Sequence, residues 1–500
     1  MLNPLNDRTG FVNAAGELIY VWSISSGSGA PKHQLYCPGL SETGLRGANI
    51  TRAIFSPDTD ASMVVGGLAD GSLCIWDLRA SRFGMCPTRN DPVRSSDSDQ
   101  SDYRRIMFAK APIYSTSGVD IQLVTSTQSA FMDSKSKLHE AESRRRCSTN
   151  EVHRQHYYRA QSQHHSVPIV DVQLTPSARC DPCLTTFQFA ALDESGELSL
   201  WMVLRPARST VYNIYESLAG SQTDLGLRPA EHVVQMVCLA YLIPTLPLDF
   251  ELGDWSTMEG VEEVGDQMLP LRDKPKINAT TLALSGSGDF LLGFNNGAIV
   301  RLSRSSKQSV YPRQFGQPWN RAAVRCLAVH SIAEFKFFLA GYADGFIRMY
   351  HINQPEPVYE RNICDICDCQ LSAVKLIWST SRPSIFFCLD SSGRITSLDM
   401  VEVLHEGNMD EEIDCAQKHT MASVNQGLVI HVPSAKLEQQ RVYDFALSRG
   451  VLVSSNGQTQ IMSAFALIYP EAVKIHWLDS QWSHGTGEEL KLTRDRFSQL

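Results

Sequence analysis

The segment Met63-Val-Val-Gly-Gly-Leu-Ala-Asp70-Gly71-Ser-Leu-Cys-Ile-Trp76-Asp77 shows the pattern that decides the fold. An apolar run leads to a turn that ends in Gly, and a second strand follows with a large residue five positions after that Gly. The Asp-Gly pair supplies the positive φ angles that a tight turn between two strands needs. The segment therefore predicts a β-hairpin over 63–77.

Other copies of this pattern, some of them weaker, occur along the chain. Together they predict hairpins near 11–22, 63–77, 187–203, 290–303, 337–351, 385–399 and 451–463. A further strand precedes most hairpins, as at 50–55, 169–174 and 324–329. One strand followed by a hairpin with a large closing residue is typical of a blade of a WD-type β-propeller. We therefore predict an all-β, seven-bladed WD-type β-propeller over 1–480, followed by a polar C-terminal tail over 481–500.

The large residues that close four of the hairpins are Trp22, Trp76, Trp201 and Tyr350. Aromatic side chains of this size bury large areas, so we expect them to seal the packing between neighbouring blades rather than to bind a ligand. Asp70 and Asp344 precede turn glycines, and we expect them to brace those turns.

The spacing of the turn glycines tests the propeller prediction. Intervals of 55, 48 and 48 residues separate the glycines at 16 and 71, 297 and 345, and 345 and 393, near the blade period of ~40–45 residues. Intervals of 125 and 101 residues predict long loop insertions at about 80–165 and 204–276, or else degenerate extra blades hidden in them. The first blade is incomplete, because only ten residues precede Phe11. Either the segment 472–477 completes the ring or upstream sequence is missing, and we expect the second.

The composition excludes several classes of protein. Of the 500 residues, 43% are hydrophobic, which excludes a wholly disordered chain. A formal net charge of -9 argues against a nucleic-acid binder held by phosphate contacts. Thirteen cysteines are too few for a disulfide scaffold and indicate reduced thiols. Neither a signal peptide nor an apolar run long enough for a membrane span is expected.

Motifs that would carry chemistry are weak. A phosphate-binding loop of the Walker A type is excluded, because the chain contains no Gly-Lys pair. The Gly-rich segment 285–288 is interpreted as a turn between two strands. Metal-like spacing occurs at Cys180 and Cys183, and again at Cys364, Cys367 and Cys369, but we interpret these cysteines as loop thiols because a zinc site would need distant blades to meet. No catalytic, cofactor-binding or metal-binding residue is therefore assigned, and no cofactor is expected.

Three segments carry biased charge. The segment 131–165 holds seven Lys or Arg against four acidic residues, and we interpret it as a solvated loop, although an acidic partner is an alternative. Seven acidic residues and no basic one lie in 249–266, and six and none in 402–414. Both acidic segments are expected to be exposed connections.

Four segments carry a resemblance to one family: 50–79, 187–201, Asp224-Leu-Gly-Leu-Arg-Pro229 and 338–348. They are similar to the propeller half of the cytoplasmic dynein-2 intermediate chains of the WD repeat protein 60 type, over about residues 15–400. The resemblance implies a non-catalytic subunit of the motor for retrograde intraflagellar transport and cilium assembly, located in the cytoplasm, the cytoskeleton and the cilium. It implies that the propeller binds the dynein-2 heavy chain. Binding of dynein light chains and pairing with the second intermediate chain are expected of an upstream region that this sequence does not include.

Two other functions stay open at this point. One is another WD-repeat scaffold, such as the companion dynein intermediate chain or a substrate receptor of a ubiquitin ligase. The other is a propeller enzyme, which would place carboxylates or a metal at the central channel. The protein-binding residues, and the face that carries them, are not assigned by the sequence.

Overall fold

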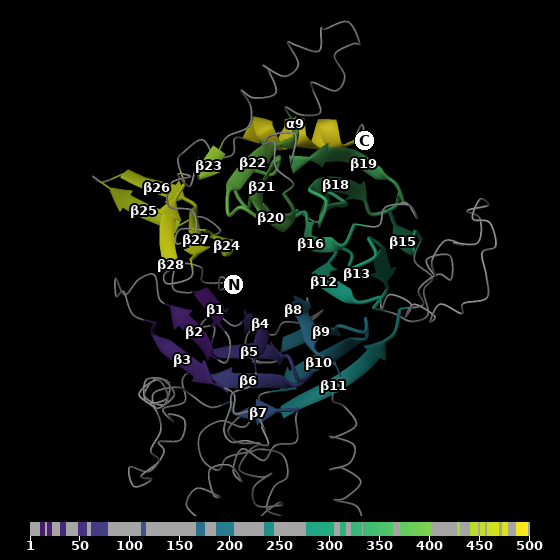
Figure 1. The fold of residues 1–500 in the computed structure, drawn as a ribbon. Coiled ribbons are helices and arrows are strands. Elements are labelled where there is room, and N and C mark those ends of the chain that lie inside the picture. The colour runs from purple at the N-terminus through teal and green to yellow at the C-terminus, as the bar shows by residue number, and fades with distance from the viewer. Residues whose placement is uncertain are drawn as a thin grey trace, which may run out of the picture. The chain divides into compact units, whose positions relative to one another are not determined.

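The computed structural model describes residues 11–15, 18–22, 31–36, 49–57, 62–78, 112–116, 167–175, 187–204, 235–244, 277–304, 311–316, 322–332, 334–363, 371–401, 428–430, 441–448, 451–455, 458–469, 473–478 and 487–498. The chain divides into two compact units, of which the first comprises 1–194 and 198–241 and the second 195–197 and 242–500. Strands dominate both units (Figure 1).

The described strands of the first unit form three sheets, each built from strands that follow one another in the sequence. The first sheet contains β1 (Phe11–Ala15), β2 (Leu18–Trp22) and β3 (His33–Tyr36). The second contains β4 (Ile50–Phe55), β5 (Met63–Leu68), β6 (Leu73–Asp77) and β7 (Tyr114–Ser115). The third contains β8 (Ile169–Thr175), β9 (Phe187–Asp193), β10 (Leu198–Leu204) and β11 (Gln235–Leu242).

The second unit contains the remaining sheets. Three of them have four strands in sequence order, and we call them blades 4, 5 and 6. Blade 4 contains β12 (Ala279–Leu284), β13 (Phe290–Phe294), β14 (Ile299–Leu302) and β15 (Gln314–Phe315). Blade 5 contains β16 (Val324–Val329), β17 (Phe337–Tyr342), β18 (Phe346–His351) and β19 (Pro357–Asn362). Blade 6 contains β20 (Ala373–Trp378), β21 (Ile385–Asp390), β22 (Ile395–Asp399) and β23 (Leu428–Ile430).

The seventh set of strands differs from the others in its pairing. Strands β24 (Asp444–Leu447), β27 (Ala464–Ile468) and β28 (Val473–Trp477) form one sheet in that order. Between β24 and β27 the chain makes a separate two-stranded sheet of β25 (Val451–Ser455) and β26 (Gln458–Met462). The hairpin expected at 451–463 is therefore present, but it stands outside the sheet that β24 begins. The segment around 472–477 pairs with β27 as the third strand of that sheet.

The turn glycines have the backbone conformation that the sequence pattern requires. Gly71, Gly196, Gly297, Gly345 and Gly393 have φ angles of 84°, 91°, 87°, 89° and 87°. This left-handed region is costly for residues that carry a Cβ, so glycine is the residue that closes these hairpins without strain. Asp70 and Asp344 accept hydrogen bonds from the backbone N–H groups of Ser72 and Phe346, at 2.9 and 3.2 Å. The predicted bracing role of both carboxylates is confirmed.

The large closing residues are core residues. Trp76, Trp201 and Tyr350 are at most 1% exposed, and Trp22 is partly buried. The indole N–H of Trp76 also donates to the carbonyl of Tyr36 in the preceding sheet, at 3.1 Å. Trp76 therefore joins two sheets of the first unit, as the structural interpretation predicted.

Glycine at one position of the second strand lets neighbouring sheets approach closely. A Cβ on Gly67 would lie 2.4 Å from Cγ2 of Ile169, a residue in the first strand of the next sheet. The equivalent contacts in the second unit are 2.7 Å, from Gly293 to Val324 and from Gly341 to Ala373. Side chains at these positions would force the sheets apart, because protein interiors are close-packed.

The C-terminal tail and the two insertions differ from the predicted domain plan. Residues 481–500, expected to be a polar tail, contain helix α9 (Gly487–Phe497), which packs on blades 5 and 6. The expected insertions 80–165 and 204–276 include the outermost strands of two sheets, β7 and β11. Apart from 112–116, 204 and 235–244, both insertions, including the charged segment 131–165, lie outside the described residues.

The fold class predicted from the sequence is confirmed: the chain is an all-β protein of the WD-type β-propeller class. Its described strands form seven successive sheets, if the detached β25–β26 hairpin is counted with the sheet it interrupts. No described helix is long and apolar enough to cross a membrane.

Candidate protein-binding face

The loops between the first and second strands of blades 4, 5 and 6 share one local geometry. The backbone N–H groups of Ser285, His330 and Ser379, each just after a first strand, donate to carbonyls at the start of the second strand. The distances are 2.8, 3.1 and 2.8 Å. Because these closures are equivalent, the loops lie at the same end of their blades, and their side chains contribute to one face of the unit.

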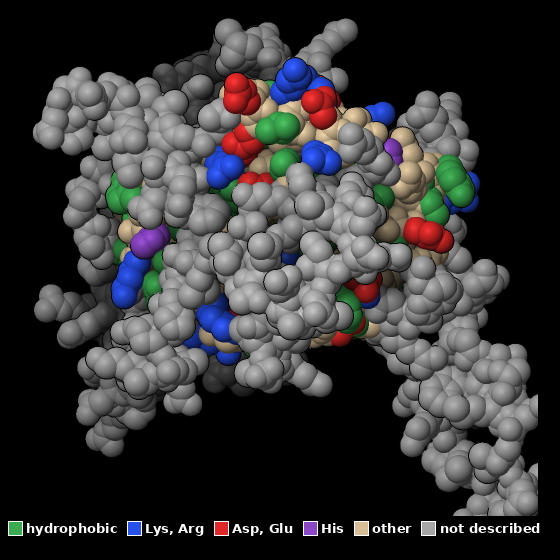
Figure 2. All heavy atoms as spheres, turned by 90° about the horizontal axis from the view of Figure 1, so that it is seen from above, with side chains coloured by type: hydrophobic (Ala, Val, Ile, Leu, Met, Phe, Trp, Pro, Cys, Tyr) green, Lys and Arg blue, Asp and Glu red, His purple; other side chains and the backbone are tan. Residues whose placement is uncertain are grey.

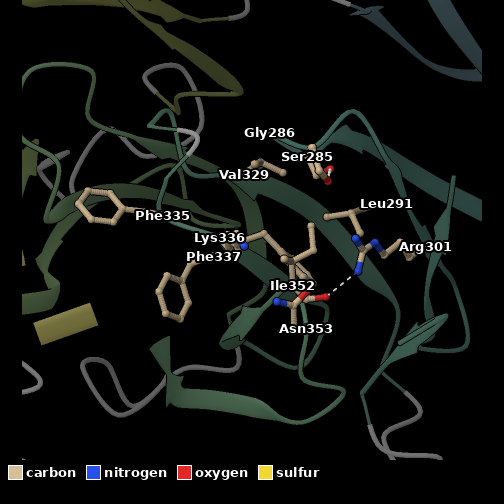
Figure 3. A pocket seen from close by; sticks show the side chains of 12 residues that line it. Ser285, Gly286, Leu291, Arg301, Val329, Phe335, Lys336, Phe337, Ile352 and Asn353 are labelled. Atoms are coloured by element: carbon tan, nitrogen blue, oxygen red, sulfur yellow. Dashed lines mark hydrogen bonds between the residues drawn. The ribbon is translucent and has the colours of Figure 1, made fainter. Parts of the chain in front are cut away.

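A cavity of about 250 Å³ opens on this face between blades 4 and 5 (Figure 3). Its buried lining is mainly apolar and includes Leu291, Phe338 and Ile352. Lys336 and Asn353 are exposed lining residues. The cavity therefore combines an apolar interior with a polar edge, which is the usual composition of a specific binding pocket.

The charge of Arg301 in this lining is compensated. Its Nε and Nη2 donate to Oδ2 of Asp289 at 3.0 and 2.6 Å, and both side chains are largely buried. Its Nη1 donates to the carbonyl of Ile352 in blade 5, at 2.8 Å (Figure 3). Arg301 therefore ties blade 4 to blade 5, as a guanidinium with several donors in fixed directions does well.

Lys336 differs from Arg301, since it forms no ion pair with another described residue. Its positive charge acts on its surroundings: the pKa of His351 is lowered, first by burial and then by Lys336. The cavity thus has at its edge a positive charge that no carboxylate of the described residues pairs with.

Helix α9 occupies the next groove on the same face, between blades 5 and 6. Phe497 in its last turn is 4% exposed and packs into a cluster of aromatic rings. Its ring centroid lies 5.4, 5.0 and 6.5 Å from those of Phe335, Phe337 and Trp378. The three contacts are edge-to-face, a favourable arrangement of aromatic quadrupoles.

A second anchor of α9 is ionic. Both carboxylate oxygens of Glu489 accept from Nε of Arg382 at 3.0 Å, and Oε1 also accepts from the hydroxyl of Ser384 at 3.0 Å. Arg382 further reaches Asp399 at 3.4 Å. These partly buried contacts fix the N-terminal half of α9 on blade 6, while Phe497 fixes its C-terminal end against residues of both blades.

His330 supports the aromatic cluster as a neutral ring. Its Nδ1 accepts from the backbone N–H of Ile332 at 3.1 Å, and its Nε2 donates to the carbonyl of Pro383 in blade 6 at 2.8 Å. Both contacts require the neutral tautomer with the proton on Nε2. Burial lowers the pKa of His330 below its ordinary value, in keeping with this role.

The surface near α9 is mixed in character. Figure 2, seen from the side on which α9 lies in Figure 1, shows acidic, basic and apolar side chains next to one another. Leu492, on the outer side of α9, is 52% exposed. Elsewhere, β11 exposes Leu239 by 45%, and Ile243 just beyond it by 73%. Single exposed apolar side chains are normal on a protein surface, so these residues do not by themselves define a contact surface.

The other motifs singled out in the sequence add no reactive site within the part of the chain that the structure describes. The segment 285–288 forms a turn between β12 and β13, as predicted. Cys180, Cys183, Cys364, Cys367 and Cys369 lie outside the described residues. Among the described residues, no group of three or more His, Cys, Asp or Glu side chains could hold a metal ion.

Sequence reasoning missed the cavity and the groove of α9. The sequence signals for the groove were the aromatic residues at 335–338 and 378 and the single aromatic residue Phe497 near the C-terminus. Their proximity depends on how two blades pack, which a linear pattern does not contain.

The strands, hairpin turns and blade contacts define this chain as a protein of the WD-repeat β-propeller class. No family model matches the sequence. Two solved structures are similar in fold. The Saccharomyces cerevisiae Sqt1 structure matches with a TM-score of 0.43 and 10% identity, over 94% of this chain and 81% of that one. The β-propeller domain of Myceliophteria thermophila Cps50 (Swd1) matches with a TM-score of 0.45 and 11% identity, over 96% and 95%.

Among individual proteins, the chain is similar to cytoplasmic dynein 2 intermediate chain 1. The mouse protein is 26% identical over 395 residues, which is 77% of this chain and 31% of that protein. The human protein is 26% identical over 392 residues, 77% of this chain and 29% of that protein. This chain therefore spans about a third of the length of these relatives. The resemblance predicted from the sequence is confirmed.

Proposed function

We propose that this chain is a non-catalytic WD-repeat subunit of the dynein-2 complex, of the intermediate-chain type. The observation that carries the proposal is the similarity to cytoplasmic dynein 2 intermediate chain 1 over 77% of the chain. The similarity extends over 395 residues, which is far more than a short motif would give.

In this proposal the blades present loops to the dynein-2 heavy chain, and the complex drives retrograde intraflagellar transport and cilium assembly. Loops held by a rigid sheet scaffold are well suited to this task, because their side chains are positioned before the partner arrives. Light chains and the second intermediate chain would join through sequence upstream of the propeller. The protein would act in the cytoplasm, along the cytoskeleton and in the cilium.

Affinity purification from ciliated cells tests the proposal. The tagged chain is expected to recover the dynein-2 heavy chain, and its depletion is expected to slow retrograde movement of transport particles inside the cilium. A WD-repeat protein of similar size with the same tag is the control. Absence of the heavy chain from the purified material, together with normal retrograde movement after depletion, would contradict the proposal.

A further inference from the structure

The cavity between blades 4 and 5 is the counterpart of the slot that receives Phe497. Trp378 is the last residue of β20 and pairs with Phe386, just as Val329 is the last residue of β16 and pairs with Phe338. Trp378 and Phe386 belong to the cluster around Phe497, whereas Val329 and Phe338 line the cavity.

Hydrogen bonds extend this equivalence to the edge of the cavity. The N–H of Met400 donates to the carbonyl of Ser384 at 2.9 Å, and the N–H of Ile352 donates to the carbonyl of Lys336 at 2.8 Å. Lys336 therefore stands where Ser384 stands in the neighbouring groove. Since Ser384 contacts the carboxylate of Glu489, Lys336 occupies the position that faces a carboxylate of a docked helix.

The two grooves differ at several positions: Asp289 of blade 4 stands where Phe337 of blade 5 stands in the groove of α9, and a smaller residue ends the first strand. Val329 replaces the larger Trp378, and no described side chain fills the space this leaves. The resulting volume of about 250 Å³ exceeds the roughly 150 Å³ cavity that accepts benzene in a protein core. The volume is therefore large enough for a phenyl ring or a branched aliphatic side chain.

From these equivalences we propose that the cavity between blades 4 and 5 is a docking site for an amphipathic helix of a partner protein. The helix places a large apolar side chain in the cavity and a carboxylate beside Lys336, as α9 places Phe497 and Glu489 in the adjoining groove. The inference rests on the proposed function in one respect, that the natural partner is the dynein-2 heavy chain.

The segment 335–338 forms a wall between the cavity and the groove of α9. Phe335 and Phe337 contact Phe497 on the α9 side and also line the cavity; Figure 3 shows both rings on the opposite side of the view from Arg301. A partner helix in the cavity would therefore lie next to α9, and the wall between them is already held in place by Phe497.

The probe is a fluorescein-labelled peptide with the sequence of residues 487–498, titrated into the purified full chain by fluorescence anisotropy. In the chain its own α9 fills the groove between blades 5 and 6, so the labelled copy is directed to the other groove. We expect saturable binding that weakens at least tenfold when the peptide residue equivalent to Phe497 is replaced by Ala. Lys336→Glu in the chain is expected to weaken binding by a similar factor.

A charge exchange makes the test independent of folding. A peptide with Lys in place of the residue equivalent to Glu489 is expected to bind Lys336→Glu better than it binds the original chain. Lys474→Glu, which reverses an exposed charge on β28, is the control and should leave binding unchanged. No saturable binding, or binding that ignores both Lys336→Glu and the exchange, would overturn the inference.

Recovery of the heavy chain from cells separates this inference from the proposed function. If the original chain recovers the heavy chain and Lys336→Glu recovers it several-fold less, the result supports both the proposed function and the docking site. Equal recovery by both chains overturns the inference and leaves the proposed function in place. If the original chain recovers no heavy chain, the proposed function fails, and the peptide titration alone decides the docking site.

Discussion

Replacement of Phe497 by Ala should release helix α9 from its groove while leaving the blades folded. The side chain is 4% exposed and its ring meets those of Phe335, Phe337 and Trp378 at centroid distances of 5.0 to 6.5 Å. Burying a Phe side chain contributes about 1.5–3 kcal/mol. Because the helix can undock instead of leaving a cavity, we expect a loss of docking free energy of about 2–3 kcal/mol rather than the ~3–5 kcal/mol of a deep core truncation.

The expected loss of docking free energy can be measured as an increase in the rate of amide hydrogen exchange in α9. Every 1.4 kcal/mol is a factor of ten, so the amide protons of α9 should exchange roughly 30 to 150 times faster in Phe497→Ala. Amide protons of β17 and β21 should exchange at nearly the original rate. Peptide-resolved exchange measured by mass spectrometry resolves the two regions.

Leu492→Ala is the matched control, since Leu492 lies on the same helix and is 52% exposed. It should leave exchange in α9 almost unchanged, because little apolar contact is lost. Equal acceleration in the two variants would refute the reasoning, since it would mean that helix propensity alone, and not the aromatic slot, holds α9 in place.

Three other perturbations follow from the described contacts. Burial lowers the pKa of His330 in the folded chain, so below the ordinary pKa of about 6.5 the unfolded chain binds a proton more readily than the folded chain does. The free energy of unfolding should therefore fall as the pH drops below about 6.5. Urea titrations at several pH values should show a weaker pH dependence for His330→Phe. Gly67→Ala places a Cβ 2.4 Å from Ile169 and should cost about 1–3 kcal/mol, seen as a lower melting temperature; an unchanged value would show that the sheets separate freely. Arg301→Met leaves the largely buried carboxylate of Asp289 without its cation and should cost about 3–5 kcal/mol, whereas adding Asp289→Asn should recover part of this loss in the same denaturation assay.

The hairpins could be predicted from the sequence because their signals are local. An Asp-Gly or Asn-Gly pair defines the turn, and Trp76 or Tyr350 a fixed distance later marks the end of the strand. These rules depend on the φ angle of one residue and on alternation along one strand, and both are visible in a window of fifteen residues.

Features that depend on packing between blades were not predictable in this way. The glycines at 67, 293 and 341 are needed because another strand approaches from the next sheet. Similarly, the sequence of α9 is mostly polar, and Phe497 is a core residue only because it packs against side chains of blades 5 and 6. The hairpin predicted at 451–463 is present as β25 and β26 but pairs outside the sheet of β24, and its turn signal alone does not distinguish the two arrangements.

The attachment of α9 has a consequence for biosynthesis. Glu489 binds Arg382 across 107 residues of sequence, and the strands of the last sheet lie between them. During translation, the residues of blades 5 and 6 are therefore synthesised before those of α9, which covers their aromatic rings. Chains that end before α9 would expose the apolar side chains of Phe335, Phe337 and Trp378. Exposed apolar surface of this kind is recognised by chaperones and proteases in incompletely folded proteins.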